Sequence, residues 1–176
     1  MNTSDKGITL LKHLEGLRLK AYPCSAGVAT IFWGCTVYPD GTRVKLGDTG
    51  TIEQAEKCFQ HDLRIAENAV NKAMFDFKFN LTQCQFDSLV CFVFNVGEPR
   101  FRSSTLLKVI SGHKTEIPIE TAFLMWNKED ATRDGKDNDG DGLTDEPGEK
   151  RSNEGLTNRR KSEAWLFLHD EIKLFS

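Results

Sequence analysis

The stretch TIEQAEKCFQHDLRIAENAVNKA, residues 51–73, decides the fold of this 176-residue chain. Its apolar side chains recur at steps of three and four residues, which places them on one face of an α-helix; they are Ala55, Phe59, Leu63, Ala66, Val70 and Ala73. Thr51 and Gln54 have the spacing of a capping box, the pattern that fixes the first turn of a helix. We therefore predict a long amphipathic helix that begins after Thr51.

The residues before this helix predict a second helix and a small β-meander. Residues 3–16 read as a helix that Ser4 or Asp5 caps and Gly16 ends. LRLKAY (17–22) alternates apolar and polar residues as a half-buried strand does, and TIFWG (30–34) and RVKLG (43–47) are further extended runs. The turn YPDGT (38–42) separates the last two.

The residues after the long helix predict a helical bundle. Thr82 and Gln85 form a second capping box before FDSLVCFVFNVG (86–97), whose apolar residues surround the helix and predict a buried centre. Three further helices are predicted: STLLKVI (104–110), which starts at Ser103 or Ser104; IPIETAFLMW (117–126), with Pro118 in its first turn; and a last helix that Thr157 opens. The fold class is α+β in one domain, residues 1–176. A small lobe of about 1–50 and a helical lobe of about 51–176, with an acidic insertion at about 128–152, leave a cleft between them.

Composition and charge are those of an ordinary globular protein. Hydrophobic residues make up 39% and charged residues 28%, and the net charge is −3. Residues 129–149 hold nine acidic and two basic residues, so this segment carries −7 and the remainder about +4. A mildly basic body suits an anionic partner, although many proteins without one share it.

The five cysteines are odd in number and lack metal-ligand spacing, so we expect reduced thiols and synthesis in a reducing cytoplasm. Cys58 and Cys84 fall in helical segments and are expected to be small buried side chains. We find no signal peptide and no apolar run long enough to span a membrane, so other means must carry the protein to an outside target.

The stretch EGLRLKAYPCSAGVAT, residues 15–30, holds the candidate chemistry: Glu15, Cys24 and Thr30. A carboxylate at the C-terminal end of a helix is electrostatically unfavourable, which calls for another reason for Glu15 to be there. From the residues alone, a solvated glutamate at a helix end remains the simpler alternative.

Residues 15–34, EGLRLKAYPCSAGVATIFWG, are similar to the pattern EGxRLxAYxCxAGxxTIGYGHT of the phage-type lysozymes, glycoside hydrolase family 24. The resemblance continues through VYPDGT, GDTGTIEQAE, LTQCQFDSLVCFVFNVG, FRSSTLL, WN and GLTNRR, which is nearly the whole chain in order. It implies a lysozyme-like fold and a muramidase that cleaves the β-1,4 bond between N-acetylmuramic acid and N-acetylglucosamine in peptidoglycan.

The resemblance also implies roles for individual residues. Glu15 would protonate the leaving oxygen, while Cys24 and Thr30 would stabilise the developing positive charge or orient the attacking water. Cys24 as a buried apolar side chain in a loop stays open as the alternative. The implied substrate-binding residues are Phe32, Phe94, Asn95, Gly97, Ser104 and Arg159, where core packing is an equal alternative for Phe94 and pairing with a carboxylate is one for Arg159.

Three residues depart from the family pattern. Phe32, Trp33 and Cys35 stand where it has glycine, tyrosine and histidine. Phe32 either narrows the cleft or packs in the core, and Cys35 removes a structural polar pair. These changes bear on the fit of the substrate more than on the type of reaction.

The acidic insertion contains DNDGDGLTDEPGE (137–149), which resembles the first half of an EF-hand loop. Its hard oxygen ligands favour calcium as a structural ion; the expected ligands are Asp137, Asp139, Asp141, the Leu143 carbonyl, Asp145 and Glu149. Gly148 occupies the position where glutamate usually closes the loop. A flexible acidic insert without a bound ion is the alternative, and catalysis itself needs no cofactor.

Two biological settings fit these expectations. One is a phage endolysin that crosses the membrane through a holin, and the other is a bacterial effector with an immunity protein as partner. In both, the protein is a monomer that acts on the cell wall or in the periplasm and binds no nucleic acid. A non-catalytic wall-binding module and a calcium-dependent interaction module remain the alternative functions.

Overall fold

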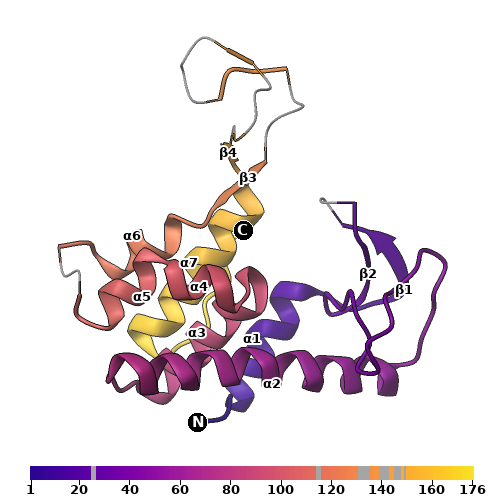
Figure 1. Cartoon of the computed structure of the whole chain (residues 1–176), viewed down its shortest axis with the longest axis horizontal. Coiled ribbons are helices and arrows are strands. Elements are labelled where there is room, and N and C mark those ends of the chain that lie inside the picture. The colour runs from indigo at the N-terminus through magenta and orange to yellow at the C-terminus, as the bar shows by residue number, and fades with distance from the viewer. Residues whose placement is uncertain (25–26, 114–115, 131–134, 139–142, 145–147, 149) are drawn as a thin grey trace.

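The computed structural model describes residues 1–24, 27–113, 116–130, 135–138, 143–144, 148 and 150–176 (Figure 1). Along this part of the chain the helices are α1 (Asp5–Glu15), α2 (Ile52–Phe77), α3 (Gln83–Val96), α4 (Glu98–Ser103), α5 (Thr105–Ile110), α6 (Ile119–Leu124) and α7 (Glu154–His169). The strands are β1 (Arg18–Pro23), β2 (Ala29–Phe32), β3 (Lys128–Asp130) and β4 (Lys150–Ser152). The mostly helical chain with small antiparallel sheets confirms the α+β class.

Helix α2 is the long helix predicted from residues 51–73. Both halves of its capping box are present: Thr51 accepts from the Gln54 backbone N–H, and the Gln54 side chain accepts from the Thr51 N–H. All six predicted apolar positions are buried, together with Cys58 and Ala69. Figure 1 shows α2 running along the base of the molecule, from below β1 and β2 to the helices at the far end.

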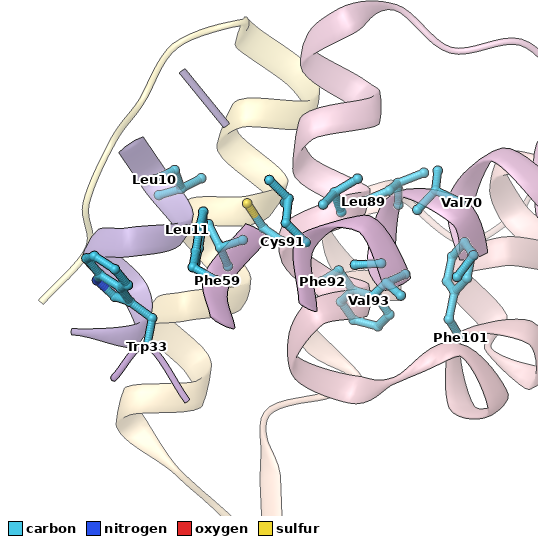
Figure 2. Packing of buried hydrophobic residues seen from close by; sticks show 14 of the residues in the cluster. Leu10, Leu11, Trp33, Phe59, Val70, Leu89, Cys91, Phe92, Val93 and Phe101 are labelled. Carbon is cyan, nitrogen blue, oxygen red and sulfur yellow. The ribbon is translucent and has the colours of Figure 1, made fainter. Parts of the chain in front are cut away.

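Helix α1 packs with the helical lobe. Ser4 caps it by accepting from the Gly7 N–H, and Gly16, at φ 65°, ends it. Leu10 and Leu11 are fully buried and lie in the same core as α3, as Figure 2 shows. The expected division at about residue 50 placed α1 in the small lobe. In the structure α1 packs against α3 of the helical lobe and also contacts the segment after β2 through Lys12 and Glu15.

The small lobe contains one two-stranded sheet. β1 and β2 are antiparallel, with Tyr22 opposite Thr30 and an irregularity between Arg18 and Tyr22. The third strand predicted at 43–47 is wrong: that segment makes only the isolated bridge Val37–Arg43. Asp48 explains this, because its carboxylate accepts from the Tyr38 hydroxyl at 2.9 Å and from the Lys45 N–H at 2.9 Å, which bends the chain before a ladder can extend.

Helix α3 is the centre of the helical lobe, as predicted. Every residue from Phe86 to Val93 is buried, and α1, α2 and α7 pack around the helix. Helix α7 is capped by Asn153 rather than opened by Thr157, because the Asn153 side chain accepts a hydrogen bond from the Leu156 N–H at 2.8 Å, so the helix begins at Glu154.

The helical lobe also contains the short helices α4 and α6 and the strand pair β3 and β4. Helix α4 was not predicted, and Pro118 is the N-cap residue of α6 rather than a member of its first turn. β3 and β4 pair in register at the start and end of the acidic insertion, with Glu129 opposite Arg151. No helix in the described ranges combines the length and the apolar character that crossing a membrane requires.

Candidate active site

Glu15 is the last residue of α1, and its carboxylate is held in a narrow place. The side chain is 14% exposed, and its Oε1 lies 2.7 Å from Nη2 of Arg159 in α7. Its Oε2 lies against Gly34, where an added Cβ would approach to 3.1 Å. Gly34 has φ 85°, so a residue without a side chain suits both its backbone and its contact with the carboxylate.

Arg159 joins Glu15 to a buried network of charges. Its Nε is 3.0 Å from Glu163 Oε1, and its Nη2 donates to the Cys91 carbonyl at 3.2 Å. Arg160 pairs with the same Glu163 oxygen at 2.9 Å and donates to Asn95 Oδ1 at 3.0 Å. Burial would by itself lower the pKa of Arg159, but Glu15 and Glu163 outweigh it and raise that pKa. Arg159 is therefore a fixed cation, as the alternative of pairing with a carboxylate anticipated.

For Glu163 and Arg160, the other two members of the network, burial shifts the pKa more than the neighbouring charges do. It raises the pKa of Glu163, against the opposing effect of both arginines. It lowers the pKa of Arg160 to about 10, despite the proximity of Glu163. Both side chains are fully buried, so each depends on the other for its charge to be compensated.

Cys24 and Thr30 are held together by one carbonyl group. The Cys24 backbone N–H donates to the Val28 oxygen at 2.9 Å, and the Thr30 hydroxyl donates to the same oxygen at 3.0 Å. Thr30 is 4% exposed on β2, and Cys24, which follows β1, is partly buried. The chain runs from Glu15 through Gly16 and Leu17 into β1, and from Thr30 through β2 to Gly34, the residue that the Glu15 carboxylate contacts.

A hollow of about 240 Å³ lies between the small lobe and the helical lobe. Gly34, Thr36 and Val37 line it from the small lobe; Asp62, Ile65, Ala66, Val93, Phe94, Gly97 and Glu98 line it from α2, α3 and α4. Gly34 is also the residue against which the Glu15 carboxylate rests, so Glu15 lies next to this part of the wall, although Glu15, Cys24 and Thr30 are not themselves among the lining residues. The structure thus places Phe94 and Gly97 in the lining, and places Asn95 as an exposed neighbour that accepts from Arg160.

Phe32 and Ser104 are placed away from this hollow. Phe32 is 2% exposed, with its ring against Gly50 and edge-on to Tyr38 at 6.5 Å between centroids. Its φ of 59° turns the side chain into the small lobe, so of the two expectations for Phe32 the structure has core packing. Ser104 is 3% exposed and caps α5 by accepting from the Leu107 N–H at 3.0 Å, which corrects its expected role at the substrate.

Sequence reasoning missed Asp62. It lines the hollow from α2, and burial raises its pKa to about 6, against the opposing effect of His61. The signal was present in the helical spacing, because Asp62 lies three residues after Phe59 and four before Ala66, at the edge of the buried stripe. A pattern of apolar residues alone does not mark a polar residue at the edge of that face.

The predicted calcium ligands Asp139, Asp141, Asp145 and Glu149 lie outside the described residues. Asp137 and Leu143 are described and exposed. Within the ranges that the structure covers, no group of three His, Cys, Asp or Glu side chains is arranged to hold a metal ion. The calcium site therefore stays a prediction from sequence.

Comparisons with known proteins agree on one family. The model of the family described as phage lysozyme matches residues 12–163. The chain is 38% identical over 128 residues to an endolysin of Salmonella phage P22, which covers 73% of this chain and 85% of the relative. It is 34% identical over 168 residues to an endolysin of Acyrthosiphon pisum secondary endosymbiont phage 1, with coverage of 95% and 98%.

The fold is also similar to that of a solved endolysin structure. The endolysin from Escherichia coli O157:H7 phage FAHEc1 matches with a TM-score of 0.79 and 35% identity, over 98% of this chain and 97% of that one.

Proposed function

Because the chain belongs to the phage lysozyme family, we propose that it is an endolysin whose proton donor is Glu15. The family and its endolysin relatives make the protein a glycosidase-type hydrolase of peptidoglycan. The finer statement is a muramidase that cleaves the β-1,4 bond between N-acetylmuramic acid and N-acetylglucosamine.

The placement of Glu15 is the observation that carries this proposal. A glycosidase needs a carboxylic acid that is directed at the glycosidic oxygen and screened from bulk water. Glu15 is 14% exposed, is fixed by Arg159 at 2.7 Å and rests on Gly34 at the wall of the hollow between the lobes. A glycan bound across Gly34 would present its linkage to this carboxyl group.

In this proposal, Cys24 and Thr30 assist the attack on the sugar, whereas Glu15 assists the departure of the leaving group. The Thr30 hydroxyl uses its proton to bond the Val28 carbonyl, so the lone pairs of its oxygen remain available to accept a hydrogen bond from a water molecule. Such a contact would orient the water for attack on the sugar. The Cys24 side chain, held one residue beyond β1, would stabilise the positive charge that develops on the sugar ring, and would do so more strongly as a thiolate than as a thiol.

Analysis of the reaction products tests the bond assignment. Purified peptidoglycan is digested, the fragments are reduced with borohydride, and their ends are identified by mass spectrometry. A muramidase leaves new muramic acid ends that borohydride reduces. Fragments that end in 1,6-anhydromuramic acid would identify a transglycosylase, and reduced glucosamine ends would identify a glucosaminidase; either would overturn the proposed bond.

We further propose that the insertion binds a structural calcium ion through the oxygens of Asp137, Asp139, Asp141, Leu143, Asp145 and Glu149. The alternating carboxylates and the glycine at Gly142 support this. Side-chain contacts link β3 to β4 and to Asn153, the residue that follows β4. Arg151 Nε lies 2.9 Å from Glu129 Oε1, and the Asn153 side chain donates to Glu129 Oε2 at 2.7 Å.

Thermal melting in calcium, magnesium and chelator tests the ion, with Asp139→Asn as the matched variant. Calcium should raise the melting temperature of the wild type more than magnesium does, and the variant should lose most of this increase. Equal melting temperatures in calcium and in chelator would contradict the site.

The relatives also favour one biological setting. The curated proteins that match are phage endolysins, which supports release of a phage through a holin rather than delivery as a bacterial effector. We propose that the protein acts there as a monomer on the cell wall.

A further inference from the structure

A chain of buried ion pairs leads from the proposed proton donor into α7. Glu163 lies one helical turn after both arginines of this helix, so Arg159 and Arg160 can both reach it. Its Oε1 accepts from Arg159 Nε at 3.0 Å and from Arg160 Nη2 at 2.9 Å. Arg159 Nη2 in turn lies 2.7 Å from Glu15 Oε1. A single guanidinium group therefore separates Glu163 from Glu15.

The surroundings of Glu163 determine which charges it can compensate. α7 packs on α3 and α6, and the Ser88 hydroxyl of α3 donates to the Glu163 carbonyl oxygen at 2.7 Å. The charged and titratable groups that face the Glu163 carboxylate or its neighbours are Arg159 and Arg160 of α7, Glu15 of α1, and Cys91 and Asp87 of α3. Burial raises the pKa of Cys91, so this thiol carries no charge at neutral pH. Glu120 of α6 lines a separate hollow with Lys161.

The charges of the four bonded side chains balance only when Glu15 is ionised. Arg159 and Arg160 supply two positive charges, since burial lowers the pKa of Arg160 only to about 10. A hydrogen bond from each arginine to one oxygen is the arrangement of an ionised carboxylate, so Glu163 supplies one negative charge. A protonated Glu15 therefore leaves one positive charge in excess. Because the side chains are withdrawn from water, these charges act strongly on one another.

We propose that Glu163 is a positioning residue that acts on Glu15 through Arg159. It fixes the guanidinium group that holds the Glu15 carboxyl group, and its negative charge lets Glu15 keep the transferable proton at a higher pH than two arginines alone would allow. Arg160 has the opposite effect, because it adds positive charge on the far side of Glu163. This inference rests on the proposed function, since it takes Glu15 as the proton donor.

The pH dependence of kcat in Glu163→Gln tests this role. Cleavage of soluble peptidoglycan fragments is measured at saturating concentration between about pH 4 and pH 9. The upper limb of the profile, where activity falls because the donor has lost its proton, should move to lower pH by roughly 1 unit. All variants act on the same substrate, so the titration of the substrate cancels in the comparison. An upper limb at the wild-type pH would overturn the proposal.

Arg160→Gln gives the reciprocal test. It leaves one arginine to serve two carboxylates, so the last proton should leave at a higher pH and the upper limb should move upward. The double variant Glu163→Gln with Arg160→Gln removes one charge of each sign, and its limb should return close to the wild-type position. Shifts in the same direction in both single variants would refute a role through charge. If Glu163→Gln does not fold, Arg160→Gln decides alone, and an unmoved or lowered limb there overturns the proposal.

Two controls separate this role from lost stability and from a failure of the proposed function. Leu106→Ala removes a fully buried side chain of α5, so it should lower the melting temperature and leave the upper limb in place. A limb that moves equally in Leu106→Ala would assign the shift to lost stability and refute the role of Glu163. Glu15→Gln is measured in the same assay: a wild-type rate there would refute the proposed function. An inactive Glu15→Gln beside an unmoved limb in Glu163→Gln would refute only the inference about Glu163.

Discussion

Arg159 is the residue on which the geometry of Glu15 depends. Its guanidinium group is 8% exposed and contacts Glu15, Glu163 and the Cys91 carbonyl at once. Only a planar group with several fixed N–H donors can serve three acceptors in this way. A glutamate beside the hollow would otherwise be free to change rotamer and to lose its direction toward the substrate.

Arg159→Lys should therefore lower wall lysis and stability together. A lysine keeps the charge but cannot reach all three partners, so at least one of the buried carboxylates, Glu15 or Glu163, loses its ion pair with this residue. We expect a loss of about 3–5 kcal/mol in unfolding free energy and a fall in kcat of roughly 10-fold or more, measured by urea unfolding and by turbidity. Arg151→Lys is the control, because the Arg151 side chain is 47% exposed and its pair with Glu129 should matter by less than about 1 kcal/mol. Equal effects of the two variants would contradict the role of Arg159.

Asp62 should make stability depend on pH. Burial raises its folded pKa to about 6, from 3.8 for an ordinary aspartate. The folded state therefore holds this proton more tightly than the unfolded state, so the contribution is fully present below pH 3.8 and is lost as the pH rises through about 6. Asp62→Asn should melt at a higher temperature than the wild type above pH 6, and the difference should vanish near pH 4.

Asp40→Asn provides the comparison, because hydrogen bonds from Thr42 lower the pKa of Asp40 and reverse the sign. That variant should melt at a lower temperature than the wild type at neutral pH. Melting curves for both variants at several pH values decide the matter: an Asp62→Asn curve parallel to that of the wild type would show that the carboxyl group is not penalised by burial.

At the level of single residues, the sequence predicted those whose role follows from chemistry and motif. The carboxylate pairing of Arg159 is confirmed, and the catalytic role of Glu15 stays a prediction. Phe32 was left open between cleft and core, because the direction of its side chain depends on a positive φ that no local pattern announces. Ser104 was assigned to the substrate because its segment resembles one that lines the groove, whereas its hydroxyl serves the backbone.

Secondary-structure elements begin where side chains satisfy the exposed N–H groups of the first turn, and this made several of them predictable. The capping boxes at Thr51 and Thr82 are both formed as their spacing indicates. The start of α7 was misplaced because Asn153 and Thr157 are both acceptable caps, and sequence alone does not rank them. Strand 43–47 failed for a tertiary reason, the bonds that Asp48 makes across the loop.

Ser104→Ala distinguishes a helix cap from a substrate contact. Loss of the bond to the Leu107 N–H should lower the unfolding free energy by about 1 kcal/mol and leave KM for wall fragments unchanged. Ser103→Ala is the control: Ser103 bonds only backbone carbonyls at the end of α4, so its loss should have a smaller effect on stability. A raised KM in Ser104→Ala at unchanged stability would return Ser104 to the substrate site.

On the scale of the whole molecule, aromatic packing joins the small lobe to the helical lobe. The Phe59 ring of α2 lies 5.5 Å from that of Trp33 and 5.9 Å from that of Phe94, between centroids. Trp33 belongs to the small lobe and Phe94 to the lining of the hollow, so Phe59 couples the two sides of the proposed cleft. Figure 2 shows Phe59 and Trp33 continuing the core of α1 and α3. This junction, like the packing of α1 on α3, involves contacts distant in sequence that periodicity cannot reveal.

Phe59→Ala should weaken both stability and activity. Removal of a ring that is 2% exposed leaves a cavity and is expected to cost about 3–5 kcal/mol, and the loosened lobes should lower kcat further. Phe75→Ala on the same helix is the control, since Phe75 is 75% exposed and its loss should change neither property appreciably. Urea unfolding and turbidity assays of both variants measure the two effects; a Phe59→Ala protein as stable as Phe75→Ala would refute the junction.

The most direct measurement is the rate at which purified Glu15→Gln clears peptidoglycan, compared with wild type at equal folded concentration. Glutamine keeps the shape of the side chain and removes the transferable proton, so kcat should fall by at least about 100-fold while circular dichroism shows an unchanged fold. Clearance by the variant at a rate within about twofold of the wild type would mean that some other group supplies the proton, and the account of Glu15 would be wrong.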